Sequence, residues 1–198
     1  MRSVTAAIAA ALLCSCTSEP AEQAADQPAD QPSPGPTFTP SGETDMSATP
    51  PPVAQDHAAL LASDDPTLAA NKRLVYDMYR IVLQGGYAGR AGEFIAVDYI
   101  QHNPNAEQGL AGVQDYIRKT RGEIPLEDRL ELPMINLMAE GDHVTIAFAR
   151  GEKDAAGNTY YTTWFDMFRI ENGKIAEHWD PMLKTDAPID PNSQRLGN

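Results

Sequence analysis

The chain of 198 residues contains only two cysteines, Cys14 and Cys16, and both stand near its start. The remainder of the sequence therefore has no thiol for a disulfide, a zinc site or a nucleophilic cysteine. Basic residues are also scarce, because 15 Lys and Arg stand against 28 Asp and Glu, which gives a formal net charge of -13. Such an acidic chain is a poor candidate for binding nucleic acid or anionic lipid through its surface.

Several motifs of catalytic chemistry are missing as well. The sequence has no Gly-x-Ser-x-Gly, no phosphate-binding loop and no dinucleotide fingerprint, so a serine nucleophile and nucleotide chemistry have no support. It also lacks a His-Glu-x-x-His spacing. Two His and two carboxylates could bind a metal ion, but without such spacing we expect neither a metal nor a cofactor.

The first 15 residues are typical of a lipoprotein signal peptide. One basic residue precedes an apolar run from Val4 to Leu13, which is too short to span a membrane. The tetrapeptide Leu13-Cys14-Ser15-Cys16 resembles a bacterial lipobox with Cys16 as the lipidated residue, since Leu13 is too large to precede the site of cleavage. An ordinary secretory signal is the alternative. The lipobox predicts a secreted lipoprotein, anchored on the periplasmic or outer face of the cell envelope without spanning the membrane.

Residues 16–56 form a predicted disordered tether. From Thr17 to Asp56 the sequence holds nine of the 16 prolines and seven acidic residues, but no Lys or Arg. Such a segment has too little apolar mass to offset the entropy of ordering. We expect it to hold a globular domain, residues 57–198, away from the bilayer.

That domain begins with helical patterns. Ser63 to Pro66 is a helix start with an Asp cap and Pro in the first turn, and Gly85-Gly86 ends the helix. A shorter helix is expected over 88–97, a loop over 99–104 and a third helix over 112–121. Four strands follow, and helices before an antiparallel meander indicate an α+β fold. The expected strands are 130–138, 143–152, 160–170 and 174–182.

The last two strands form a hairpin around Asn172-Gly173, a dipeptide that tolerates positive φ. Its register decides which titratable side chains share a face, because side chains alternate with a period of two. A two-residue loop separates Asp166 from His178 and Asp180. A three-residue loop that includes Glu171 instead puts Asp166 opposite His178. Both registers fit the sequence.

The three-residue loop would give the hairpin two distinct faces. One face would carry Trp164, Asp166, His178 and Asp180. The other would carry Phe165, Met167, Arg169, Ile175, Glu177 and Trp179.

The sequence from Phe165 to Asp180, with Tyr99-Ile-Gln-His-Asn-Pro104 upstream, resembles the SnoaL-like branch of the nuclear transport factor 2 superfamily. That branch is named for a polyketide cyclase. The resemblance covers residues 67–182 and implies a cone-shaped fold, in which N-terminal helices pack in a curved antiparallel sheet around a cavity. It favours the three-residue loop, because the family's pocket requires positions 166 and 180 to share a face.

In the cyclases the Asp that closes the Glu-His-Trp-Asp motif is the acid/base, and it corresponds to Asp180. They carry a His at the position of Asp166, so their mechanism does not transfer unchanged. The resemblance implies two sets of site residues. The catalytic set is Asp180, Asp166, His178 and His102, and the substrate-binding set is Tyr99, Trp164, Tyr79 and Asn103.

Each catalytic candidate also has a purely structural explanation. Asp166 can pair with Arg169 or with a backbone group, and His178 can be a surface residue. Asp180 can cap the end of a strand, and His102 can fix a loop by a hydrogen bond.

Two functions therefore stand side by side. The first is a metal-independent acid/base enzyme of the isomerase, dehydratase, cyclase or hydrolase type, acting on a small hydrophobic carbonyl compound. The second is a non-catalytic module that binds a ligand or a protein at the cell envelope. Members of the superfamily often dimerise through the outer face of the sheet. A homodimer would use the apolar Phe165, Met167, Ile175 and Trp179.

Overall fold

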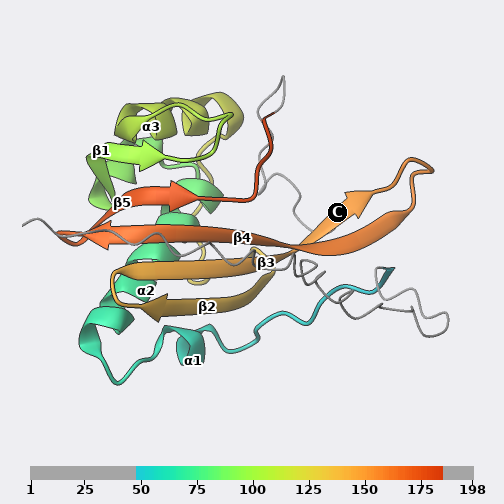
Figure 1. Ribbon diagram of the computed structural model, residues 1–198, viewed down its shortest axis with the longest axis horizontal. Coiled ribbons are helices and arrows are strands. Elements are labelled where there is room, and N and C mark those ends of the chain that lie inside the picture. Colours follow the sequence, from blue (N-terminus) through green and yellow to red (C-terminus); the bar gives the residue numbers. More distant parts are fainter. Residues whose placement is uncertain (1–47, 185–198) are drawn as a thin grey trace, which may run out of the picture. The chain divides into compact units, whose positions relative to one another are not determined.

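The computed structural model describes residues 48–184, in which helices cover one face of a five-stranded sheet (Figure 1). The predicted α+β fold is confirmed. None of the helices in this part of the chain is long and apolar enough to cross a bilayer. The helical elements are α1 (His57–Leu61), α2 (Pro66–Met78), the π-helix η2 (Tyr79–Gln84), the 3-10 helix η3 (Ala88–Glu93) and α3 (Gly109–Thr120). The strands are β1 (Ile95–Gln101), β2 (Met134–Glu140), β3 (His143–Lys153), β4 (Thr159–Glu171) and β5 (Lys174–Trp179).

Helix α2 begins where the sequence predicts, and the helical run that continues into η2 ends at the predicted Gly85-Gly86. The carboxylate of Asp65 caps it by accepting hydrogen bonds from the backbone N–H groups of Thr67 and Leu68, and Pro66 occupies the first turn. Its last turns continue as the π-helix η2, and the chain then leaves through Gly86 at φ 78°. Tyr79, the first residue of η2, follows buried Val75 by four residues on the same helical face, and 1% of its surface is exposed.

Helix α1 was not predicted, and two side chains hold its ends. Asp56 accepts a hydrogen bond from a backbone N–H of its first turn. The ammonium group of Lys72 on α2 donates to the carbonyls of Leu60 and Ala62 at the other end, at 2.6 and 2.5 Å. The segment that precedes α2 is thereby fastened to α2.

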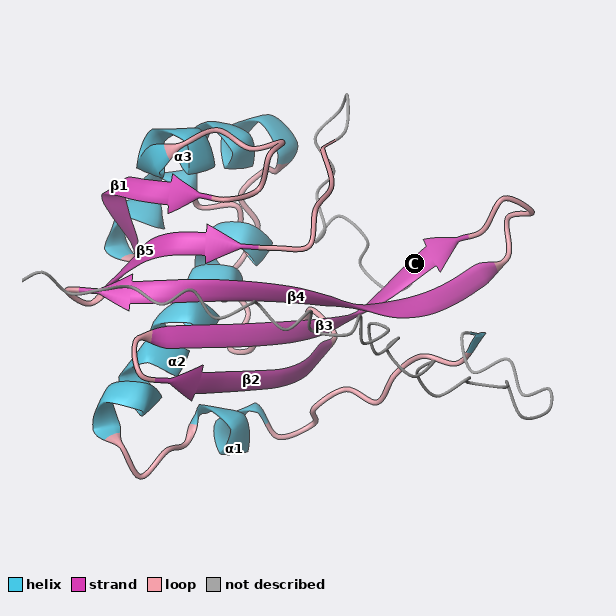
Figure 2. Cartoon of the chain, viewed as in Figure 1, coloured by secondary structure: helices cyan, strands magenta, loops and turns pink. Residues whose placement is uncertain are grey.

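The sheet has the strand order β1-β5-β4-β3-β2. Figure 2 shows the strands as one layer, with the helices packed against one of its faces. Strands β2 to β5 form the predicted antiparallel meander. Strand β1 runs parallel to β5 at the edge, a pairing that the sequence analysis missed. The helix predicted over 88–97 is wrong beyond Glu93, because Ile95 and Tyr99 are buried on a strand that pairs with residues far along the chain. The loop expected over 99–104 accordingly begins only after Gln101.

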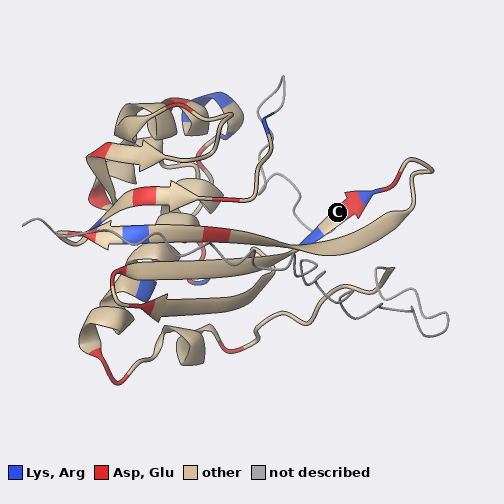
Figure 3. Cartoon of the chain, viewed as in Figure 1, with Lys and Arg blue, Asp and Glu red and all other residues tan. Residues whose placement is uncertain are grey.

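Strands β3 and β4 extend past their neighbours as a twisted hairpin (Figures 1 and 2). The turn at its tip is closed by the carboxylate of Asp154, which accepts from the backbone N–H groups of Ala156 and Asn158. Acidic residues recur along the strands and loops, with Lys and Arg scattered between them (Figure 3).

The β4–β5 hairpin combines features of both predicted registers. Its loop has two residues, since Glu171 pairs with Lys174 and both Asn172 and Gly173 have positive φ. The three-residue loop is therefore wrong. One pair further on the register shifts, because Ala176 is an extra residue on β5 with no partner on β4.

This bulge at Ala176 brings the site residues together. Beyond it, Phe168 pairs with His178, so the inner face carries Trp164, Asp166, Phe168 and His178. The three-residue loop was expected to place Trp164, Asp166 and His178 on one face. The bulge at Ala176 places them there instead. Two predictions fail: Phe168 instead of Asp166 lies opposite His178, and Ile175, which lies before the bulge, points inward with its side chain completely buried.

Candidate functional site

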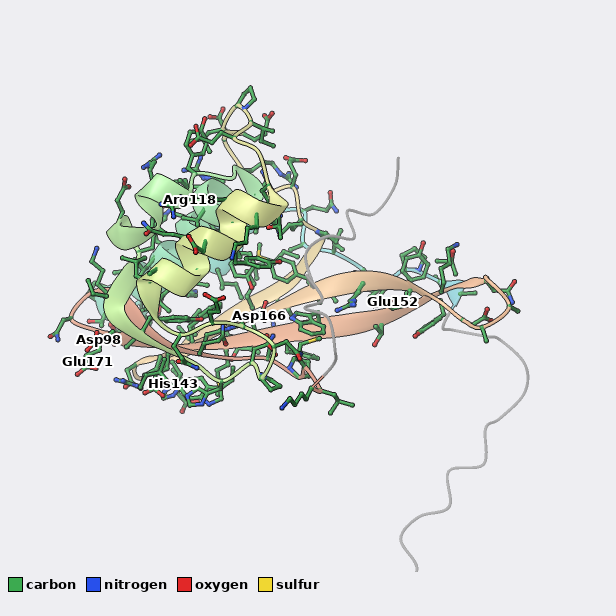
Figure 4. The ribbon with its side chains drawn as sticks, turned by 90° about the horizontal axis from the view of Figure 1, so that it is seen from above. Asp98, Arg118, His143, Glu152, Asp166 and Glu171 are labelled. Carbon is green, nitrogen blue, oxygen red and sulfur yellow. The ribbon has the colours of Figure 1, made fainter. Side chains whose placement is uncertain are left out.

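A cavity of about 230 Å³ lies between α3, η2 and the inner face of the sheet. This volume suits a small molecule. Figure 4 shows Asp166 between the sheet and the helices, with Glu152 toward the far end of the β3–β4 hairpin. Apolar lining comes from Met78, Tyr79, Leu83, Ile95, Val113, Phe168 and Ile175. The linked polar side chains are Tyr99, Gln101, Asn103, Asp166, His178 and Asp180.

Asp166 is the most deeply buried carboxylate of the site, with 1% of its surface exposed. The hydroxyl of Tyr79 donates to its Oδ2 atom. The indole N–H of Trp164 donates to its Oδ1 atom at 2.9 Å, and Nε2 of His178 lies 3.0 Å from the same oxygen. Burial of a carboxylate is tolerated where hydrogen-bond donors surround it, and three groups do so here.

His178 is held in place by its ring face and by both ring nitrogens. The imidazole stacks on Phe168, with 4.7 Å between ring centroids and 19° between planes. Its Nδ1 atom lies 3.0 Å from Oε1 of Gln101. That oxygen also accepts the backbone N–H of Asn103, so it cannot donate, and Nδ1 must carry a proton.

The second ring nitrogen of His178 faces the carboxyl group of Asp166. With Nδ1 protonated, a neutral ring would point its Nε2 lone pair at an ionised carboxylate, which is repulsive. One proton is therefore held between His178 and Asp166, either as an ion pair or as a neutral pair. In both forms this dyad stores a proton in the cavity wall.

Asp180 is a second carboxylate, directly after β5. Its Oδ2 atom accepts the side-chain amide N–H of Asn103 at 2.7 Å, and its Oδ1 atom accepts the backbone N–H of Met182 at 3.0 Å. Asn103 is itself oriented, because its Oδ1 atom accepts the backbone N–H of Asn105. One atom each of Asp166, His178 and Asp180 lies within 4.8 Å of the others. An acceptor thus stands beside the proton of the dyad.

Tyr79 and Tyr99 remain protonated phenols at this polar end. Burial raises the pKa of Tyr79 well above its ordinary value, and the neighbouring Asp166 raises it further. Burial also raises the pKa of Tyr99, with smaller contributions from Asp166 and Asp180. The Tyr99 oxygen accepts the side-chain N–H of Gln101 at 3.0 Å, so its own proton can be donated to another group.

Two of the expected site residues do not line the cavity. His102 lies on the opposite face, where its ring stacks on Trp179 at 4.6 Å and its Nε2 atom lies 2.9 Å from Glu177. The alternation of side chains after β1 causes this, because Tyr99, Gln101 and Asn103 point inward. Trp164 is buried behind the cavity and reaches it only through Asp166.

Gln101 is a lining residue that the sequence analysis did not identify. Its signal was present in Tyr99-Ile-Gln-His-Asn-Pro104, where alternate residues share a face if the segment is a strand. Because the segment was predicted to be a loop, this pattern was not used. A predicted strand would have placed Gln101 on the face of Tyr99 and Asn103, and His102 on the opposite face.

The triad of Asp166, His178 and Asp180 offers the ligand types that a divalent metal uses. The oxygens of Asp166 are already occupied by Tyr79 and Trp164. The geometry fits a shared proton better than a metal ion.

Cys16 and the rest of the predicted signal peptide lie outside the described residues, as does most of the predicted tether. The predicted anchor therefore has no structural account. The last 14 residues of the expected domain also lie outside that part of the chain.

Solved structures with similar folds cover a little over half of this chain. TsrD from Streptomyces laurentii is 25% identical with a TM-score of 0.43, over 60% of this chain and 90% of that one. An LEH-like epoxide hydrolase from M. tuberculosis is 15% identical with a TM-score of 0.43, over 58% and 84%. A protein of unknown function with a cystatin-like fold from Xanthomonas campestris is 24% identical with a TM-score of 0.40, over 56% and 88%.

A comparison with curated proteins finds no match. The family model described as SnoaL-like polyketide cyclase matches residues 73–182, from α2 to just beyond β5. This span is more than half of the 198 residues and contains every residue of the cavity's polar end. The chain therefore belongs to the SnoaL-like polyketide cyclase family.

Proposed function

We propose that the domain is a metal-independent acid/base enzyme acting on a small hydrophobic carbonyl compound. One observation carries the proposal: the two ring nitrogens of His178 lie 3.0 Å from Gln101 Oε1 and 3.0 Å from Asp166 Oδ1, in the wall of a largely apolar cavity that also contains Asp180. An acid and a base thus face the same small volume. Isomerisation, dehydration and cyclisation all need a proton removed at one atom and delivered at another.

Each polar group has a role in such a reaction. Asp180 is the general base that removes a proton from the carbon next to the carbonyl, whose oxygen then gains negative charge. The Tyr99 hydroxyl donates a hydrogen bond to that oxygen, since its raised pKa keeps it protonated. The dyad of His178 and Asp166 delivers a proton to the developing product. Tyr99 thus replaces His102, which does not line the cavity, in the predicted catalytic set.

The apolar part of the cavity defines the substrate class. The described residues that line the cavity include a single basic side chain, Lys119, which is largely exposed and lies next to Asp115. An anionic group at the polar end would meet Asp166 and Asp180 instead. We therefore expect an uncharged carbonyl compound with an aliphatic or aromatic body.

Deuterium exchange tests the proposal without knowledge of the natural substrate. The protein is incubated in D₂O with a panel of cyclic and aromatic ketones, and NMR follows deuterium incorporation next to the carbonyl. Asp180→Asn should lower the rate by about 10²–10⁴-fold, because it removes the base. Asp98→Asn, an exposed carboxylate on β1, is the matched control and should leave the rate unchanged.

Absence of exchange with every ketone would refute the enzyme. If a ketone nevertheless bound with equal affinity to wild type and to Asp180→Asn, the domain would be the non-catalytic binding module. Both results come from the same NMR samples.

We also propose that the domain is a lipoprotein at the cell envelope. The support is the lipobox-like sequence that ends at Cys16, followed by a Pro-rich acidic segment. Cys16→Ser should move the protein from the membrane fraction to the soluble fraction after expression in a bacterial host, whereas Cys14→Ser should not. Retention of Cys16→Ser in the membrane would contradict the anchor.

A further inference from the structure

The side chain of Gln101 contacts Tyr99, Asn103 and His178 through hydrogen bonds. It is the last residue of β1 and the parallel neighbour of His178 on β5. Its backbone is clamped by Gln108, whose amide oxygen accepts the Gln101 N–H at 2.9 Å and whose amide nitrogen donates to the Gln101 carbonyl at 2.7 Å. The strand end is thus fixed before its side chain makes any contact.

The orientation of the Gln101 amide follows from one backbone group. The N–H of Asn103 can only donate, and it lies 2.9 Å from the Gln101 atom that faces His178. That atom must therefore be the oxygen. The amide nitrogen is then left to donate to the Tyr99 hydroxyl, at 3.0 Å.

This single orientation sets the protons on two other side chains. The Gln101 oxygen accepts a hydrogen bond from His178, so Nδ1 of His178 must carry a proton. The other ring nitrogen, Nε2, then faces Asp166, and the proton shared with Asp166 lies there. At Tyr99 the oxygen accepts the amide N–H, so the hydroxyl proton is directed elsewhere. A reversed amide would conflict with the backbone N–H of Asn103.

We propose that Gln101 is a positioning residue that fixes the tautomer of His178 and the donor direction of Tyr99. The inference rests on the proposed function, since it explains why the shared proton lies on the Asp166 side of the imidazole. The competing explanation is that Gln101 only fastens β1 to β5. In that case the tautomer of His178 would not depend on the amide.

The test is the tautomer of His178, read from long-range ¹H–¹⁵N correlations of the imidazole rings in the wild-type protein. The chain has only four histidines, and His178→Gln identifies the signal. His57 is an internal reference of the opposite kind. Its Nδ1 atom accepts from the Tyr76 hydroxyl, whose oxygen is occupied by the backbone N–H of Leu130.

The wild type should show a proton on Nδ1 of His178. Gln101→Met keeps a similar volume and removes the acceptor, so the Nδ1 proton should be lost and the ring should carry its proton on Nε2, facing an ionised Asp166. Gln101→Glu restores an acceptor and should restore the Nδ1 proton. Gln108→Met removes the backbone clamp but not the amide, and should keep the wild-type tautomer.

Two outcomes would overturn the proposal: a wild-type His178 without a proton on Nδ1, or a Gln101→Met variant that keeps it. A loss of the Nδ1 proton in Gln108→Met would also refute it, because the strand clamp would then be the cause. The spectra need no substrate. Failure of the proposed enzymatic function would therefore show in the ketone exchange experiment alone.

Discussion

Two phenols and two carboxylates meet at the polar end of the cavity, and burial keeps the phenols protonated. Tyr79 and Tyr99 both have a raised pKa, with burial as the first cause and Asp166 as the second. When the pKa of a group is higher in the folded state than in the unfolded state, the group stabilises the fold. For a tyrosine this contribution is fully present at pH values below the unfolded pKa of about 10. That stabilisation is lost as the pH rises further, because only the unfolded chain releases the proton.

At this residue scale, Tyr99→Phe should make the free energy of unfolding less sensitive to alkali. Urea unfolding at about pH 8 and about pH 10.5 measures the effect, since the wild type should lose more stability between the two values. Tyr160→Phe is the control, because Tyr160 is 37% exposed on the β3–β4 hairpin. An equal alkaline loss in wild type and Tyr99→Phe would show that Tyr99 ionises normally.

The individual site residues were partly accessible from the sequence. Asp166, His178 and Asp180 followed from the motif, and the structure brings all three to the cavity. His102 and Gln101 were not assigned correctly, because their faces depend on β1, whose partner strand β5 lies far along the chain. A non-local pairing leaves no periodic signal beyond the short alternation in β1 itself.

Among the elements, the β4–β5 hairpin shows where local sequence stops being informative. The Asn-Gly turn was readable, since both residues adopt positive φ. The bulge at Ala176 was not, because alanine carries no preference for it and Ile175 and His178 fit an inner face only if the alternation breaks. The Asp65 cap of α2, which relies on neighbouring residues, was predicted, whereas α1 and its Asp56 cap were not.

Helix α1 contains a buried titratable group, His57, whose ring packs edge-on against Tyr76 at 5.7 Å. Its pKa is lowered, first by burial and then by the charge of Arg129, although the backbone of Ala54 and the charges of Glu131 and Asp56 oppose this. When the pKa of a histidine is lower in the folded state than in the unfolded state, the neutral ring stabilises the fold at pH values above the unfolded pKa of about 6.5. The stabilisation is lost as the pH falls below it.

We therefore predict that acid weakens the attachment of α1. Hydrogen exchange of the α1 backbone amides should accelerate between about pH 7 and about pH 5, beyond the intrinsic pH dependence of exchange. His57→Gln can accept and donate without titrating, so its α1 amides should show no such additional change. The same acceleration in both proteins would rule out His57 as the cause.

At the scale of the whole molecule, the outer face of the sheet carries exposed apolar side chains. Phe165 and Met138 are each 50% exposed and Met167 is 37% exposed. Thr145 pairs with both methionines, so Met138 and Met167 lie in one row across β2, β3 and β4. Surfaces of this kind often mark contacts between proteins. We propose that two copies of the chain pair through this face.

Phe165→Glu should convert a dimer to a monomer, because it places a charge on the apolar face, next to the row of the two methionines. Sedimentation at several protein concentrations measures the change. Tyr160→Glu, on the projecting part of β4, introduces the same charge outside the row and should leave the dimer intact. A wild type that sediments as a monomer at all concentrations would contradict the pairing.

The bulge at Ala176 has a consequence for how such a protein can change over time. A strand has a two-residue reading frame, and one extra residue shifts that frame for everything that follows. If Ala176 paired with Arg169 in a regular ladder without the bulge, His178 would turn to the outside and Trp179 toward the cavity, with every catalytic candidate still present in the sequence. Relatives that keep all these residues can therefore differ in activity through the presence or absence of one bulge.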